Sequence, residues 1–227
     1  MEIAPNLHWL KLGSVNAYLC VDEDGLTLLD TGNPKQEGKI LDYVRQIGRA
    51  PTDLKRILLT HADIDHAGSV AAVQQATSAQ VYASNQSAAL LPTGKGPSHN
   101  FWLMDIIGPI FMTYTPLDAS KITVVQEGDT LPVLGGLNVL STPGHTPDHI
   151  SYFSPSNRIA LIGDALAAWG DKLRPSPRII SADPDQVKTS AKKLLTLNPS
   201  IYACGHGSPI KADDPSVSAL ENDLATT

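Results

Sequence analysis

The chain has 227 residues, of which 42% are hydrophobic and 18% are charged, and its formal net charge is -6. This length favours one compact domain, residues 1–227, with a substantial hydrophobic core. The negative charge and the lack of any basic run exclude nucleic acid as the main partner, because phosphate-backbone binding needs clustered Lys and Arg.

The N-terminal sequence has no positively charged segment followed by an apolar stretch and a small-residue cleavage site. No apolar stretch of the sequence is long enough to span a bilayer. We therefore predict a cytoplasmic protein without a membrane span. The two cysteines, Cys20 and Cys204, are far apart and form no CxxC pair, so no disulfide framework is expected.

Short apolar runs alternate with turns over the first third of the chain. The segments 8–13, 15–25 and 26–32 are predicted to be strands joined by tight turns, with Asp24-Gly25 as a hairpin signal. Residues 34–49 have apolar positions at helical spacing. A strand is predicted at 54–61, a helix at 67–79 and a short strand at 80–84.

An apolar insert at about 90–116 interrupts this alternation: it opens with Pro and Gly and becomes the most apolar and aromatic part of the chain. Four strands separated by turns are then predicted over 122–166. A helix at 183–200, capped by Asp183 or Asp185, precedes a last strand at 200–205 and a polar tail. Strands followed by helix thus occur once in each half, which predicts two sheets packed face to face with helices outside.

The stretch RILLTHADIDHAGSV, residues 56–70, holds two histidines and two aspartates within six positions, directly after a predicted strand. Further on, His145 lies in STPGHTPDH, Asp164 in IALIGDAL and His206 in YACGHGSPI, each after an apolar run. One such residue alone is usually a cap or a surface group. Together, in loops at strand ends, imidazoles and carboxylates predict a site for zinc, iron or manganese.

Four motifs and their order resemble those of the metallo-β-lactamase superfamily: THADIDH, PGHTPDH, IGDAL and CGHG. The resemblance extends from LLDTG at 28–32 to His206. The resemblance implies an α/β fold, a four-layer αββα sandwich. The chain looks like the small single-domain hydrolases of the superfamily, which are similar to glyoxalase II-type thioesterases and lactonases.

The resemblance also implies two divalent metal ions, zinc first, with a bridging hydroxide as nucleophile. The ligands it implies are His61, Asp63 and His145 for the first ion, Asp65, His66 and His206 for the second, and Asp164 between the two. Asp65 and Asp164 are the candidate catalytic carboxylates. Asp30 resembles the acid that accepts a hydrogen bond from a ligand histidine, although a turn residue is an equal alternative. His149 resembles a supporting residue that is not a ligand, and His8 and His99 have no assigned role.

Asp63 departs from the commonest motif of the superfamily, H-x-H-x-D-H. A carboxylate still coordinates at that position, but three carboxylates with four histidines favour iron or manganese relative to a five-histidine site. The added negative charge would make the bridging hydroxide less acidic. The flavodiiron branch has Glu at this position, and H-x-D-x-D-H also occurs among ordinary hydrolases.

The expected activity is hydrolysis of an ester-type bond, in a lactone, thioester or phosphoester, of a small-molecule substrate. A β-lactamase would need an export signal, a nuclease would need basic surface, and the glyoxalase II enzymes proper carry a C-terminal glutathione-binding region that is not expected here. Two alternatives stay open: a mononuclear iron oxygenase of the persulfide-dioxygenase type, and a non-catalytic metal-binding relic.

The apolar insert gives the best indication of substrate chemistry. As a lid over the site it would favour an apolar substrate, and its candidate pocket residues are Phe101, Trp102, Met104, Ile107 and Phe111. A buried helix or a homodimer contact explains the same residues equally well.

Overall fold

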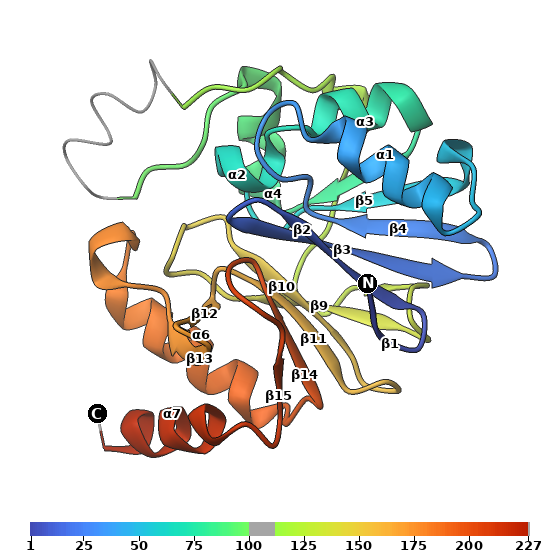
Figure 1. Ribbon diagram of the computed structural model, residues 1–227. Coiled ribbons are helices and arrows are strands. Elements are labelled where there is room, and N and C mark those ends of the chain that lie inside the picture. Colours follow the sequence, from blue (N-terminus) through green and yellow to red (C-terminus); the bar gives the residue numbers. More distant parts are fainter. Residues whose placement is uncertain (100–111, 227) are drawn as a thin grey trace.

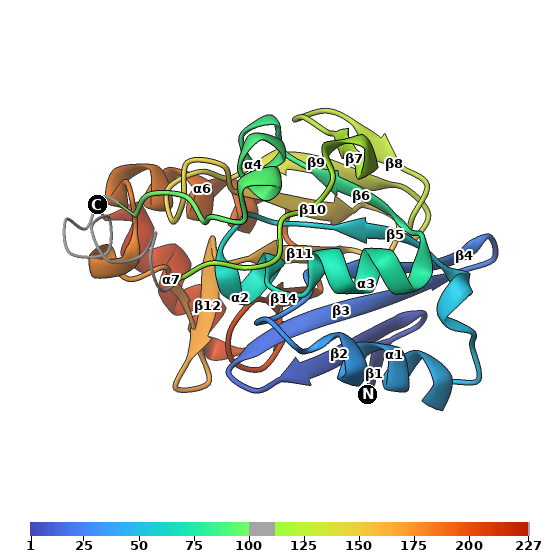
Figure 2. The ribbon, with the colours of Figure 1, turned by 90° about the horizontal axis from the view of Figure 1, so that it is seen from above.

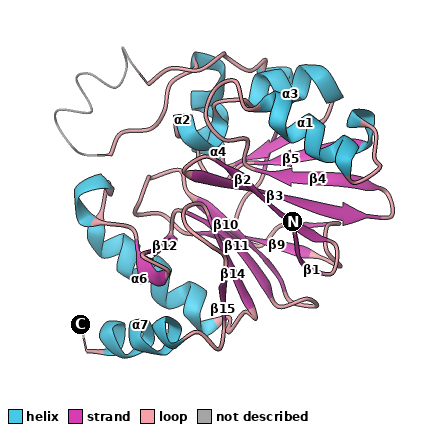
Figure 3. Cartoon of the chain, viewed as in Figure 1, coloured by secondary structure: helices cyan, strands magenta, loops and turns pink. Residues whose placement is uncertain are grey.

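The computed structural model describes residues 1–99 and 112–226. Two sheets pack face to face between helices, as Figure 1 shows. The predicted αββα sandwich is confirmed. In the view of Figure 3 the strands form the two inner layers and the helices lie outside them.

In the described residues, the first sheet has the strand order β1-β2-β3-β4-β5-β6-β7. Its strands are β1 (Glu2–Ala4), β2 (Leu7–Leu12), β3 (Val15–Asp22), β4 (Gly25–Leu29), β5 (Leu54–Leu58), β6 (Gln80–Ala83) and β7 (Ile122–Val124). β1 to β4 pair antiparallel, and β4 to β7 pair parallel. The hairpin predicted at Asp24-Gly25 is confirmed, because the two residues Glu23 and Asp24 alone join β3 to β4.

The second sheet of the described part has the order β15-β14-β11-β10-β9-β8. Its strands are β8 (Thr130–Leu131), β9 (Leu137–Ser141), β10 (Ile150–Ser154), β11 (Ile159–Gly163), β14 (Ile201–Cys204) and β15 (Ile210–Lys211). β11 and β14 pair parallel, and the other pairs are antiparallel. A separate hairpin consists of β12 (Leu166–Trp169) and β13 (Lys172–Pro175).

Helices cover the outer face of each sheet. α1 (Glu37–Gln46) and α3 (Val70–Thr77) lie over the first sheet, as Figure 2 shows from above. α6 (Pro184–Thr196) lies against the second sheet, and the carboxylate of Asp183 caps it by accepting from two backbone N–H groups. Two short helices, α2 (Ile64–Ala67) and α4 (Asn85–Leu90), belong to the loops of the first half. The 3-10 turns are η1 (Pro51–Asp53), η2 (Leu91–Thr93), η3 (Ala119–Lys121) and η4 (Arg178–Ile180).

Three apolar clusters correspond to the three interfaces between four layers. Strand β11 shows how they form, because its side chains alternate between the two faces of the sheet. Ile159 and Leu161 pack between the sheets, whereas Ala160 and Ile162 pack against the helices outside. A strand buried on both faces needs apolar residues at every position, and IALIG provides them.

The polar tail expected after His206 is wrong for most of its length, because Pro215–Ala225 form helix α7. Asp214 accepts a hydrogen bond from the backbone N–H of Ser216, and Pro215 is the first helical residue. Val217, Leu220 and Leu224 are spaced along one face and pack in the cluster under α6. The apolar stripe was present in the sequence, but its polar surroundings concealed it.

The five candidate pocket residues of the insert lie outside the described residues. On either side of them, the chain is held by a bridge between Lys95 and Thr113 and by a hydrogen bond from Tyr114 N to Gly94 O at 3.0 Å. In the described ranges, the helices are too short or too polar to cross a membrane.

Candidate metal centre

The motif residues converge because they follow neighbouring strands at their carboxyl ends. β4 and β5 are parallel neighbours in the first sheet, and the loop with His61 follows β5. β11 and β14 are parallel neighbours in the second sheet, and Asp164 and His206 follow them. A backbone hydrogen bond of 2.8 Å from Ile150 N to Thr60 O joins the two sheets at this edge.

The residues expected around the first ion form a compact group. Oδ2 of Asp63 lies 3.3 Å from Nε2 of His61 and 3.3 Å from Nε2 of His145. Metal–donor bonds of about 2.0–2.1 Å place the ligand atoms of a tetrahedral zinc site about 3.3 Å apart. These three side chains therefore have the spacing of ligands to one tetrahedral ion.

The residues expected around the second ion lie beside them. Nε2 of His206 lies 3.4 Å from Oδ2 of Asp65 and 3.1 Å from Oδ2 of Asp164. Nε2 of His66 lies 3.4 Å from the other carboxylate oxygen of Asp164. Oδ2 of Asp164 is also 3.6 Å from Nε2 of His145, so this carboxylate contacts both groups.

Buried polar atoms that make no hydrogen bond show that these residues fit a divalent metal ion. Nε2 of His61, Nε2 of His66 and Oδ1 of Asp164 are buried and make no hydrogen bond to any described residue. Such atoms are costly, and a bound ion is one of the few arrangements that explain them. Imidazole nitrogens and carboxylate oxygens are also the donors that zinc and its neighbours prefer.

The other ring nitrogen of each ligand histidine is already occupied. The Nδ1 atoms of these histidines lie 2.9 Å from their partners, which are Thr60 Oγ1 for His61, Asp30 Oδ2 for His66, Ser176 Oγ for His145 and Ser14 O for His206. A carboxylate or carbonyl partner accepts, so Nδ1 of His66 and of His206 carries a proton. Asp30 thus has the contact that the resemblance implies, and its alternative as a simple turn residue does not account for the bond to His66.

Both ring nitrogens of His149 are taken up by contacts other than an ion, although the ring lies 5.0 Å from that of His61. Its Nε2 accepts from the backbone N–H of Asp164 at 3.0 Å, and its Nδ1 lies 2.9 Å from Thr142 Oγ1. Burial lowers the pKa of His149 well below its usual range, which keeps the ring neutral. His149 therefore positions the backbone of Asp164 and offers no free nitrogen to an ion.

A family model of the metallo-beta-lactamase superfamily matches residues 10–206, which is most of the chain. The chain belongs to the metallo-β-lactamase superfamily. Divalent metal binding is general in this superfamily, and the clusters described above supply the donors in this chain.

Relatives of known sequence and structure extend this finding. The chain is 27% identical to "Probable metallo-hydrolase YflN" of Bacillus subtilis (strain 168), over 92% of this chain and 86% of that protein. It is 29% identical to "Hydroxyacylglutathione hydrolase GloC" of Haemophilus influenzae, over 82% of each. A metallo-beta-lactamase family protein from Thermus thermophilus has the same fold, with a TM-score of 0.73 at 22% identity over 99% of this chain and 81% of that one.

In this metallo-β-lactamase-fold site, acidic and basic side chains lie in opposed pairs. Burial alone would raise the pKa of Asp164, but the charge of His66 and hydrogen bonding with His206 outweigh it and hold that pKa well below the usual range. Burial would lower the pKa of His206, but its contacts with Asp164 and Asp65 raise it to about 10. The same carboxylates thus raise the pKa of His66 and of His206.

Metal uptake by the metal-free protein should release protons, and the apparent affinity should rise with pH. His206, with a pKa of about 10, is protonated at neutral pH, and its proton must leave when the nitrogen coordinates. The competition between this proton and the metal ion weakens as the pH rises toward the pKa of His206. Calorimetric titration with Zn²⁺ in two buffers of different ionisation enthalpy measures the release. A heat that is the same in both buffers at pH 7 would contradict this expectation.

Two residues beyond the motif ligands hold the loop of His61 and Asp63. The backbone N–H of Ala62 donates to Oδ2 of Asp148 at 2.9 Å, and the hydroxyl of Tyr114 donates to Ala62 O at 3.1 Å. Neither residue had a predicted role. Asp148 lies within the TPDH motif, and this position could have indicated its role. No motif indicated a role for Tyr114.

Two aromatic residues beside the ligands were also missed. His99 has its Nε2 2.9 Å from Oδ1 of Asp63, and the ring of Trp169 stacks on that of His206 with centroids 5.7 Å apart. Trp169 is 41% exposed, so it offers ring surface to solvent beside His206. No motif contains either residue: His99 is brought here by a folded loop, and Trp169 by the hairpin of β12 and β13.

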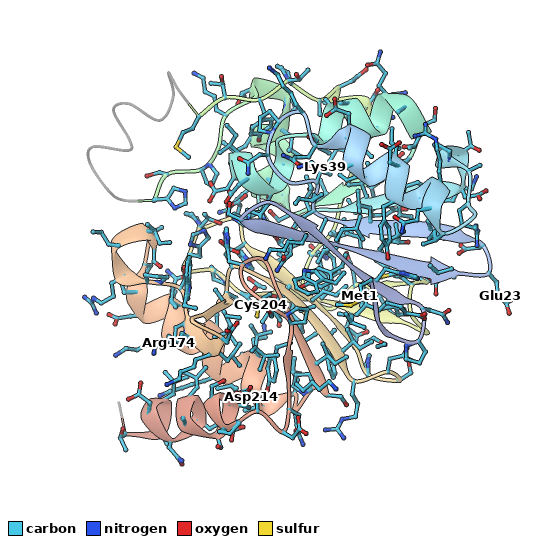
Figure 4. The ribbon with its side chains drawn as sticks, viewed as in Figure 1. Met1, Glu23, Lys39, Arg174, Cys204 and Asp214 are labelled. Atoms are coloured by element: carbon cyan, nitrogen blue, oxygen red, sulfur yellow. The ribbon has the colours of Figure 1, made fainter. Side chains whose placement is uncertain are left out.

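Gly205 leaves room for the second ligand group. A Cβ at this position would overlap Oδ1 of Asp164 and would lie 2.7 Å from Cε1 of His66. Cys204, labelled in the interior in Figure 4, immediately precedes it at the end of β14. Even a methyl side chain is therefore excluded here by the ligands themselves.

Gly205→Ala should lower the metal content and destabilise the protein by about 1–3 kcal/mol, because the added methyl forces buried ligands apart. Metal content by inductively coupled plasma mass spectrometry and the thermal midpoint measure the two effects. Gly38→Ala is the matched control, because a Cβ there meets nothing within 4 Å and the residue lies within α1. Normal metal content in Gly205→Ala would show that the site tolerates a wider spacing.

Proposed function

We propose that the protein is a dinuclear metal-dependent hydrolase of ester-type bonds in small molecules, with zinc as the first candidate metal. The observation that carries the proposal is the position of Asp164. Its Oδ2 lies near His145 of the first group and His206 of the second, which is the arrangement of a residue shared by two ions, and its Oδ1 faces His66 of the second group. Membership of the metallo-β-lactamase superfamily and relatives named as hydrolases support it.

Divalent cations at such a site lower the pKa of bound water and neutralise charge that develops on an attacked carbonyl or phosphoryl group. The chain's own residues fix where this chemistry takes place. The ligand histidines keep their Nε2 atoms toward the site because Nδ1 is held elsewhere. Asp65, whose side chain is 30% exposed, is the ligand carboxylate most open to solvent and is placed to orient an entering water or substrate.

The substrate class within this proposal is a lactone, thioester or phosphoester. The sequence disfavours glutathione thioesters only because a C-terminal glutathione-binding region is not expected. One relative with that name, GloC, aligns with this chain over 82% of its own length, although others so named align over only 48% of theirs. A glutathione thioester therefore belongs in the first substrate panel, beside lactones and phosphodiesters. The structural neighbours named as β-lactamases share about 20–23% identity and support the fold alone.

The test combines metal content with activity. Protein purified without added metal or chelator is analysed by inductively coupled plasma mass spectrometry and then assayed on the three substrate classes. We expect about two ions per chain and hydrolysis that chelator removes and metal restores. Two bound ions with no hydrolysis of any ester would contradict the hydrolase, and failure to bind any ion would leave the non-catalytic alternative.

Asp63 keeps a second candidate function open, a mononuclear iron oxygenase of the persulfide-dioxygenase type. A carboxylate with two histidines is a donor set that iron also accepts, and Asp63 forms this set with His61 and His145. One iron per chain, with oxygen uptake on thiol-derived substrates, would favour this function. We rank the hydrolase ahead of the oxygenase because the second ligand group also has a complete set of donors.

A further inference from the structure

His99 contacts the residue that departs from the superfamily's common motif. Its Nε2 lies 2.9 Å from Oδ1 of Asp63, and its Nδ1 lies 3.2 Å from the backbone oxygen of Ile180. The ring also lies against His145, with centroids 5.2 Å apart. These contacts join residue 99, the motif loop and η4, three segments that are distant in sequence.

The two oxygens of Asp63 have separate partners. Oδ1 faces His99, and Oδ2 faces His61 and His145 at 3.3 Å each. A carboxylate can bind an ion through one oxygen or through both, whereas an imidazole at this position would offer a single nitrogen. A hydrogen bond to one oxygen leaves the other as the single donor atom for an ion. The hydrogen-bond partner then also fixes the direction in which that second oxygen points.

We infer that His99 is a positioning residue for Asp63: its Nε2–H holds Oδ1, so that Oδ2 alone is presented to an ion beside His61 and His145. This inference rests on the proposed function, since it assigns a role within the first metal site. It also explains how an aspartate serves in place of a histidine there. The side chain of His99 is 15% exposed, so water competes little for the same oxygen.

The segment that contacts His99 also supports another residue of the first ligand group, His145. Ser176 Oγ lies 2.9 Å from Nδ1 of His145, and the backbone N–H of Ala182 donates to His145 O at 2.9 Å. Ile180, whose backbone oxygen lies 3.2 Å from Nδ1 of His99, lies between these two residues. One segment, 176–182, thus holds His145 directly and Asp63 through His99.

The test is a titration of chelator-treated protein with Co²⁺, followed by visible absorption, in wild type, His99→Leu and His99→Gln. Leucine removes the donor, whereas the glutamine amide nitrogen can reach the place of Nε2. His206→Ala, which removes a ligand of the second group only, identifies which step of the titration belongs to which site. His8→Leu is the matched control, because His8 bonds Tyr43 and none of the ligands.

We expect His99→Leu to weaken Co²⁺ at the first site by about 10–100-fold and to change its absorption band, as loss of a ligand's hydrogen-bond partner does. The second site should keep its affinity, and His99→Gln should restore the first. Wild-type behaviour of His99→Leu, or equal loss in both variants, would overturn the inference. If wild type binds two ions but hydrolyses no ester, the proposed function fails while the affinities still decide the role of His99.

Discussion

Asp164→Asn is expected to lower kcat/KM by about 10³-fold or more, equivalent to about 4 kcal/mol of transition-state stabilisation. Asp164 is 5% exposed, and its oxygens lie 3.1–3.6 Å from the Nε2 atoms of three ligand histidines. Asparagine preserves the size of the side chain but replaces one oxygen by an amide group that cannot coordinate. Both sites lose a shared anion, so metal content and activity should fall together.

Steady-state kinetics on the best substrate, with metal content measured on the same sample, check this result. Asp213→Asn is the matched control, an exposed aspartate in the turn before α7. Full activity with two bound ions in Asp164→Asn would mean that the carboxylate is not shared between them.

Asp30→Asn should lower the metal affinity of the second group by about 10–100-fold. The carboxylate of Asp30 accepts from Thr60 N and Thr60 Oγ1, and its Oδ2 lies 2.9 Å from Nδ1 of His66. With the amide oxygen kept on Thr60 N, the amide nitrogen faces Nδ1 of His66 and donates to it. The proton of the imidazole then moves to Nε2, the atom that must coordinate.

The substitution is a clean probe because the backbone tolerates it. Asp30 has a φ of 57°, and asparagine is among the residues that accept this left-handed region. Asp171→Asn is the matched control, since Asp171 has a φ of 56° and is exposed. Metal titration of both variants gives the comparison. Unchanged affinity in Asp30→Asn would show that Asp30 does not fix the tautomer of His66.

Several features of the fold were predictable because they depend on short-range patterns. Continuous apolar runs such as IALIG mark strands buried on both faces, and Ile159–Gly163 is such a strand. The hairpin at Asp24-Gly25 and the cap at Asp183 are set by a few neighbouring residues, and both are confirmed. Helix α7 had the same kinds of signal in Asp214-Pro215 and its apolar stripe, so its omission was an error of interpretation.

The ligand set was predictable for a related reason. Each motif follows a strand whose end is fixed by the sheet, so residues from 61 to 206 arrive at one edge once the strand order is given. The resemblance to the superfamily supplied that order, and the structure brings all seven residues together. The roles assigned to them stay predictions until metal binding is measured.

What the sequence by itself determined is therefore the layers of the fold and the chemical donors at their edge, because hydrophobic periodicity and strand-end motifs are local. The supporting contacts were decided only by the tertiary structure. His99 meets Asp63, and Asp148 meets Ala62, across 36 and 86 residues of chain. Irregular loops carry no periodicity that could predict such contacts, since their paths depend on packing against the finished sheets. Those paths fix the direction in which Asp63 presents its oxygen.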